Sequence, residues 1–173
     1  MRADARRNYD LILAAAEAEI AKSGADASLE KIARDAGVGS ATLHRHFPTR
    51  QSLLEAVFHD RVEALCAEAR RLATSADHGQ ALVDWLCDLA VHGATTRGLA
   101  ESLLHTSADS SCEVMLREAG NDLMRLAQEA GAVREGVDVD DLLTLVTAVS
   151  LATRDAGDAA RLAALALEGV RPR

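Results

Sequence analysis

The chain has 173 residues, of which 49% are hydrophobic but only 2% aromatic, and its formal net charge is −8 at pH 7. Alanine and leucine dominate, proline occurs only at positions 48 and 172, and no sustained alternating pattern indicates a sheet, so an all-α fold is expected. A uniformly distributed negative charge would argue against a nucleic-acid partner, so DNA binding would have to depend on a local basic face.

The first residues do not have the pattern of a targeting segment. They are charged, and the apolar run over residues 11–16 is short and followed by further charged residues. The longest uncharged apolar run, residues 142–153, is far shorter than a membrane span. Cys66, Cys87 and Cys112 are odd in number and lack CxxC spacing, which indicates a reduced, cytoplasmic protein. Each is expected to be a small core residue, with a thiol sensor as the alternative.

Two short helices separated by a tight turn are predicted within residues 28–47. Ser28 can cap the first helix, and Gly37 can adopt the left-handed backbone that ends it. Ser40 is placed to cap the second helix, residues 41–47. The side chains expected inside are those of Ile32, Ala33, Ala36, Val38, Leu43 and Phe47. This is the organisation of a helix-turn-helix.

The same region is the basic part of the chain. Residues 38–54 contain two arginines, two histidines and no acidic residue. Residues 1–60 hold eight Lys or Arg and nine Asp or Glu, a balance of −1, whereas residues 61–173 hold eleven and eighteen, a balance of −7. DNA binding would therefore depend on residues 38–54, with the acidic remainder kept away from the phosphates. The alternative is that this segment is only a solvated surface.

Residues 37–50 read GVGSATLHRHFPTR and are soon followed by SLLEAV. This pattern resembles the DNA-binding domain of the TetR family of transcriptional regulators, and the resemblance covers residues 3–57. Most family members have tyrosine at the position of His44. The resemblance implies a three-helix DNA-binding domain over residues 1–49, followed by a helical effector-binding and dimerisation domain over residues 50–173.

The resemblance also implies which residues contact DNA. A dimer would bind a palindromic duplex, with the 41–47 helix in the major groove of each half-site. Arg45 is the candidate for a base edge, and Ser28 for a phosphate. The full set of expected contacts is Ser28, Ser40, Thr42, His44, Arg45, His46 and Arg50. His44 and His46 are two residues apart and lie on different sides of a helix, so no metal site is expected.

Further helices are predicted to the end of the chain. Thr49, Asp77 and Asp138 are the expected caps of three of them. The expected spans are residues 50–73, 77–94, 99–105, a helix from Ser110 or Ser111 to near Gly131, residues 138–153 and residues 158–168.

The middle helices are the expected place for an effector, because family members hold their effectors there. The candidate residues are Trp85, His92, Thr96, His105, Met115 and Met124. Such a cavity would suit a largely apolar small molecule with one or two polar groups. Ordinary core packing is the alternative for each residue.

The last two helices carry the signal for a dimer. Apolar residues occur nearly all round residues 142–152, which implies a second buried face, and the final helix is rich in alanine. The resemblance implies a four-helix interface across a two-fold axis. Its candidate residues are Leu142, Leu145, Val149, Leu162 and Leu165. A helix buried in a monomer core is the alternative.

These observations together predict a dimeric repressor that a small molecule releases from DNA. No nucleophile with a base and an orienting group can be placed, and neither can a metal constellation, so we do not expect an enzyme or a cofactor. The alternatives are a helical protein-interaction module and a regulator without a small-molecule effector.

Overall fold

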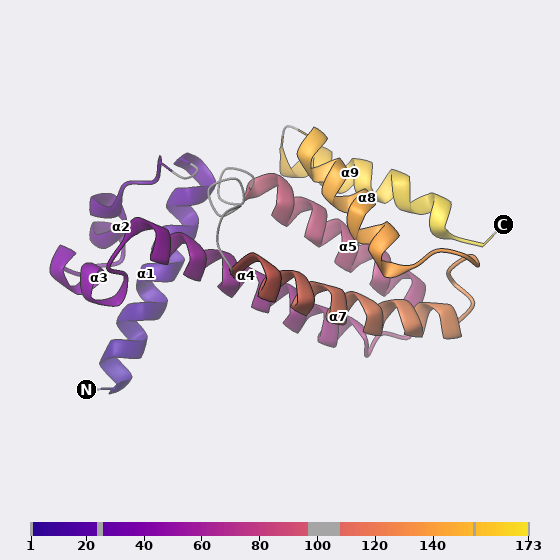
Figure 1. The fold of residues 1–173 in the computed structure, drawn as a ribbon, viewed down its shortest axis with the longest axis horizontal. Helices are drawn as coiled ribbons and strands as arrows, with labels where there is room; N and C mark the ends of the chain where they lie inside the picture. Colours follow the sequence, from indigo (N-terminus) through magenta and orange to yellow (C-terminus); the bar gives the residue numbers. More distant parts are fainter. Residues whose placement is uncertain (1, 24–25, 97–107, 154, 173) are drawn as a thin grey trace. The chain divides into compact units, whose positions relative to one another are not determined.

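The structure is a computed structural model that describes residues 2–23, 26–96, 108–153 and 155–172. The described residues form helices and no strand, which confirms the all-α prediction (Figure 1). The chain divides into two compact units, the first formed by residues 1–61 and 96–109 and the second by residues 62–95 and 110–173. The helix predicted over residues 99–105, with His105, lies outside the described residues.

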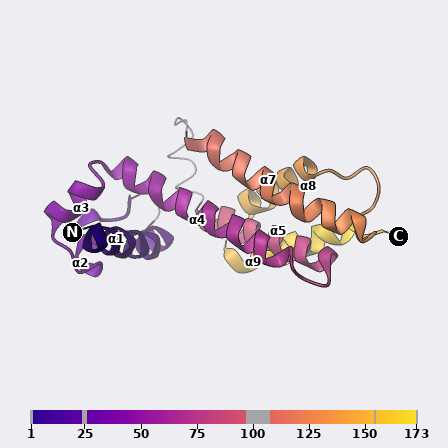
Figure 2. The same cartoon turned by 90° about the horizontal axis from the view of Figure 1, so that it is seen from below.

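The first unit contains α1 (Arg2–Ser23), α2 (Leu29–Asp35), α3 (Ser40–His46) and the beginning of α4 (Arg50–Leu72). α1 packs against α2, and α2 packs against α3 (Figures 1 and 2). The core of this unit includes the fully buried Ile12 and Ala16 of α1. It also includes the predicted inward residues Ile32, Ala33, Ala36, Leu43 and Phe47. Burial of these apolar side chains holds the short helices in place.

Ion pairs join the helices of the first unit. The ammonium group of Lys31 in α2 donates to the buried carboxylate of Glu19 in α1. Ser23 Oγ donates to the other oxygen of Glu19 at 3.1 Å. The hydrogen bond from Lys31 is the largest cause that lowers the pKa of Glu19. Arg61 of α4 pairs with Glu17 of α1 at 2.6 Å, so α1 is tied to two other helices.

In the second unit, α5 (His78–Thr95) packs against α8 (Val139–Ala152) and α9 (Ala156–Leu167). Trp85 of α5 is fully buried, and its indole N–H donates to the carbonyl oxygen of Leu65 at 3.0 Å. A Cβ on Gly120 of α7 (Ala108–Glu129) would lie 3.1 Å from the Trp85 ring and 2.8 Å from Val139 Cγ2. Glycine therefore permits the close packing of α7 around the indole.

The helix boundaries partly correct the predictions. Asp138 caps α8 as expected, because its Oδ1 accepts from Asp141 N at 2.9 Å. α7 begins at Ala108, before the predicted Ser110 or Ser111. α9 begins at Ala156 and not at residue 158, because Asp155 is its N-cap and accepts from Asp158 N at 2.9 Å. The short η2 (Glu168–Val170) follows α9.

Within the described part of the chain, no helix combines the length and the apolar character that crossing a membrane requires. The same residues contain no group of histidine, cysteine, aspartate and glutamate that could hold a metal ion.

Candidate nucleic-acid interface

The turn between α2 and α3 has the predicted construction. Ser28 Oγ accepts from Lys31 N at 3.3 Å and caps α2. Gly37 has a φ of +68°, the left-handed conformation that glycine adopts without steric cost. The amide of Val38 donates to Ala33 O at 3.0 Å and closes the helix end. These contacts fix where α3 begins relative to α2.

The second helix begins one residue earlier than predicted. Gly39 is its N-cap, and because glycine has no side chain, no side-chain hydrogen bond caps α3. Ser40 is the first residue of the helix and is exposed, so the prediction that Ser40 caps α3 is wrong. Phe47 follows the helix in extended conformation.

Two buried anchors, one within α3 and one at its C-cap, support the exposed polar face of the helix. Leu43 is 1% exposed and Phe47 is 3% exposed. His44 and Arg45 are exposed, and Thr42 is half-buried. Arg45 forms no ion pair with any described residue. The helix therefore presents a cation outward from a fixed position.

His46 is partly engaged by an aromatic residue that the sequence analysis missed. Its ring lies edge-on to Tyr9 of α1, with the ring centroids 6.1 Å apart, and Tyr9 also packs on Phe47 at 5.0 Å. His46 is half-buried. The only sequence signal for this contact is the single tyrosine of the chain, which lies on the predicted first helix.

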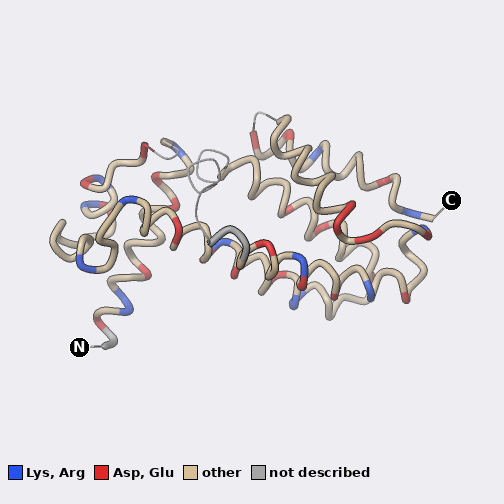
Figure 3. Tube along the Cα trace, viewed as in Figure 1, with Lys and Arg blue, Asp and Glu red and all other residues tan. Residues whose placement is uncertain are grey.

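Thr49 caps α4 as predicted. Its Oγ1 accepts from Ser52 N at 3.0 Å, while Ser52 Oγ accepts from Thr49 N at 3.2 Å. Arg50 is the first residue of α4 and is exposed. Figure 3 shows α3 and the turn into α4 without an acidic residue, in agreement with residues 38–54. The expected DNA contacts of α3 and α4 therefore share one basic strip along the chain.

The candidate effector residues that the structure describes are mostly buried. Trp85 and Met124 are 0% and 3% exposed and belong to the hydrophobic core. His92 and Thr96 are also buried, and Met115 is half-buried. None of these residues lines the groove between α5, α7 and α8 or the hollow at the first turns of α5.

A groove of about 710 Å³ lies between α5, α7 and α8. Five aliphatic side chains line it, those of Leu89, Leu116, Leu143, Ala148 and Leu151. The hydroxyl residues Thr144 and Thr147 also line it, together with Arg117, which pairs with Asp140 at 2.8 Å and Glu113 at 3.0 Å. Its lining is thus mainly apolar, with a few polar groups.

The candidate dimer residues have different environments. Leu142 is 2% exposed and packs in the core of its own unit, which leaves it no surface for a partner chain. Leu145, Val149 and Leu162 are half-buried. Leu165 is 59% exposed and so has surface available for a partner.

The buried cysteines have the features of core residues. Cys66 Sγ donates to Met115 O at 3.5 Å, and burial raises the pKa of the Cys66 thiol. Burial likewise raises the pKa of the half-buried Cys87, and Cys112 is 2% exposed. Raised pKa values keep thiols protonated and poorly reactive.

Two family models match the chain. Residues 12–57 match the bacterial regulatory proteins of the tetR family. Residues 77–172 match the C-terminal domain of SbtR-like transcriptional regulators. No curated protein matches the chain.

Solved structures resemble the whole chain. A TetR transcription regulatory protein from Mycobacterium vanbaalenii is 32% identical, with a TM-score of 0.79 and 99% coverage of each chain. A TetR transcriptional regulator from Streptomyces coelicolor is 33% identical, with a TM-score of 0.81 and coverage of 94% of this chain and 98% of that chain. RolR, solved with the ligand resorcinol, is 21% identical, with a TM-score of 0.62 and coverage of 98% and 90%.

Proposed function

The chain belongs to the TetR family of transcriptional regulators, and from this premise we propose that it is a cytoplasmic homodimeric repressor that leaves a palindromic operator when a small molecule binds. The family confirms the resemblance of residues 37–50 and makes the chain a DNA-binding regulator, not an enzyme. A regulator without a small-molecule effector and a protein-interaction module are the alternatives.

The exposed polar face of α3 is the observation that carries this proposal. Leu43 and Phe47 anchor the helix, so Arg45 and His44 face outward from a rigid support. A helix of this kind fits the major groove, where an arginine can donate two hydrogen bonds to guanine. Ser28, Ser40, Thr42, His46 and Arg50 complete the proposed set of DNA contacts. Ser28 and Arg50 would contact the phosphate backbone.

Selection of bound fragments from random duplex DNA tests this proposal. The parent protein should enrich a sequence with two related half-sites, and Arg45→Ala should lose selectivity at one base position of each half-site. Enrichment of no sequence, or an identical consensus with Arg45→Ala, would contradict the role given to α3. Arg125→Ala, whose arginine pairs with Glu129 at 2.9 Å on α7, is the matched control and should select as the parent does.

The outer faces of α8 and α9 are the proposed dimer surface. Leu165 is exposed, and Leu145, Val149 and Leu162 are half-buried residues of the same two helices. Two recognition helices must lie about 34–36 Å apart to meet half-sites one DNA turn apart, so a single chain is insufficient. A two-fold interface would place the same apolar patch on both partners.

Light scattering tests the dimer directly. The double variant Leu162→Asp with Leu165→Asp should be monomeric and should lose specific DNA affinity, because carboxylates would be buried unpaired in the interface. Val114→Asp on α7, where the valine is 51% exposed, is the control and should remain dimeric. A monomeric parent at micromolar concentration, or a dimeric double variant, would place the interface elsewhere.

The groove between α5, α7 and α8 is the proposed effector site. Its volume and its mainly apolar lining match small-molecule sites, which measure roughly 300–1,000 Å³. RolR, which shares the fold, was solved with a small aromatic ligand. An effector would release DNA by binding more tightly to a conformation whose recognition helices do not match the half-sites.

Native mass spectrometry of the purified protein tests the effector site. A bound small molecule should appear as an added mass that is missing from Thr147→Trp, whose indole would fill the groove. DNA binding should persist in that variant. An added mass that is unchanged in Thr147→Trp would place the effector elsewhere.

A further inference from the structure

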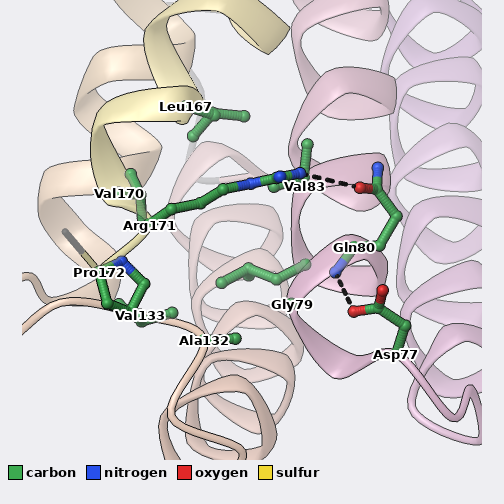
Figure 4. A pocket seen from close by; sticks show the side chains of 11 residues that line it. Asp77, Gly79, Gln80, Val83, Ala132, Val133, Leu167, Val170, Arg171 and Pro172 are labelled. Carbon is green, nitrogen blue, oxygen red and sulfur yellow. Dashed lines mark hydrogen bonds between the residues drawn. The ribbon is translucent and has the colours of Figure 1, made fainter.

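A second hollow, of about 420 Å³, lies at the other end of α5 (Figure 4). Its walls are the first turns of α5, the connection between α7 and α8, and residues 167–172 at the end of the chain. It shares no lining residue with the groove between α5, α7 and α8. Its volume falls within the usual range of small-molecule sites.

Backbone contacts fix the walls of this hollow. Gly131 has a φ of +66° and turns the chain after α7, and the amide of Ala132 then donates to Ala127 O at 2.9 Å. The amide of Arg134 donates to Val170 O at 2.9 Å and joins this connection to η2. A Cβ on Gly79 would lie 2.7 Å from Ala132 Cβ, so the approach of α5 requires glycine. The hollow is thus shaped by hydrogen-bonded main chain.

The inner surface of the hollow is aliphatic. Leu82 and Leu167 are each 1% exposed and Val170 is 8% exposed. Val83 and Val133 line the hollow as half-buried residues. A hydrocarbon chain or ring placed against these side chains would be removed from water, which favours binding.

Arg171 supplies the positive charge of the hollow. Figure 4 shows its side chain extending across the hollow towards Gln80, and Nη2 donates to Gln80 Oε1 at 3.1 Å. This partner is a neutral amide, whereas Arg117, Arg125 and Arg161 of the same unit pair with carboxylates. No hydrogen-bonded carboxylate therefore offsets the charge of this guanidinium, and further N–H donors remain for an anion.

The acidic residue of the hollow is already engaged. Asp77 Oδ1 accepts from Gln80 N at 2.9 Å, at the N-terminus of α5. The positive end of the helix offsets the charge of this carboxylate. Arg171 is thus the group that determines which charge a ligand carries.

We propose that this hollow binds a small monocarboxylate with an apolar body, whose carboxylate pairs with Arg171 while the apolar body lies against Leu82, Val83 and Leu167. Arginine and carboxylate match in geometry and form charge-assisted hydrogen bonds. The site is distinct from the proposed effector groove and does not depend on DNA binding or release.

Titration of the full chain with hexanoate, followed by NMR chemical shifts, tests the site. Hexanoate should bind at least about tenfold more tightly than hexan-1-ol or hexylamine, because only the carboxylate gains charge-assisted hydrogen bonds. Arg171→Gln should lower hexanoate affinity to that of hexan-1-ol. Val83→Trp should block all three probes by filling the hollow, and Arg161→Gln should bind as the parent does.

Two results would overturn the proposal. One is equal affinity for hexanoate and hexan-1-ol in the parent protein. The other is hexanoate binding that is unchanged in both Arg171→Gln and Val83→Trp. Thr147→Trp, which fills the groove between α5, α7 and α8, should leave hexanoate binding unchanged, so a loss in that variant would assign the ligand to the groove instead.

Discussion

Arg45 on α3 and four arginines on the helices of the second unit are in opposite electrostatic environments. The four, Arg71, Arg117, Arg125 and Arg161, pair with carboxylates. Arg45 forms no ion pair with a described residue, and no acidic residue occurs within residues 38–54. Because a neighbouring carboxylate weakens the attraction of a cation for phosphate, Arg45 is the arginine that we propose for the DNA contact of this acidic chain.

Removal of a buried side chain that anchors α3 should have the largest effect on DNA binding. Leu43→Ala deletes a side chain that is 1% exposed and should lower the free energy of unfolding of the first unit by about 2–5 kcal/mol. DNA binding should be lost with it. Urea unfolding measures the first effect, with the exposed Ala41→Ser as a control that leaves Leu43 in place. Full DNA affinity in Leu43→Ala would show that α3 does not depend on this anchor.

Arg50 provides a smaller test of the basic strip. Arg50→Ala should weaken binding to all DNA sequences alike and should reduce the slope of log affinity against log salt by about 1, because one phosphate contact is lost. Arg125→Ala removes the same charge from α7, where the arginine pairs with Glu129 at 2.9 Å, and should leave the slope unchanged. Equal slopes for Arg50→Ala and the parent would remove Arg50 from the proposed interface.

The smallest expected effect concerns two carboxylates with opposite pKa shifts. The hydrogen bond from Lys31 lowers the pKa of Glu19, so its contribution to stability is present at neutral pH and is lost as the pH falls through the lowered value. Partial desolvation, together with the charges of Glu68 and Asp84, raises the pKa of the exposed Asp88. We therefore expect Asp88 to destabilise the fold slightly at neutral pH, a cost that disappears as the pH falls through its raised pKa.

Urea unfolding at neutral and acidic pH separates these two effects. Glu19→Gln should lower stability at neutral pH and flatten the loss of stability in acid. Asp88→Asn should raise stability at neutral pH. A shift of stability in the same direction in both variants at neutral pH would contradict the opposite pKa shifts of Glu19 and Asp88.

The elements of the first unit were predictable because their signals are local. Ser28, Gly37 and Thr49 act on residues within a few positions of themselves, and each has the predicted role. The prediction that Ser40 caps α3 is wrong because Gly39 takes the N-cap backbone without providing a side chain. Tyr9 was missed because its contact with His46 joins residues far apart in the sequence.

The residues that line the hollows of the second unit could not be predicted from such local signals. Leu142 and Leu165 both belong to apolar helix faces, yet one is 2% and the other 59% exposed, and only the packing of α8 and α9 on α5 distinguishes them. Arg171 meets Gln80 across 91 positions of sequence. A periodic pattern indicates which face of a helix is apolar, but it does not indicate which partner covers that face.

The central claim is that Arg45 on α3 reads DNA sequence, and fluorescence anisotropy tests it most directly. The parent and Arg45→Ala are titrated at one salt concentration with the selected duplex and with a duplex of scrambled sequence. Loss of a guanine contact should reduce the preference of Arg45→Ala for the selected duplex by about 1–3 kcal/mol per half-site. An unchanged preference would show that α3 does not read the operator through Arg45.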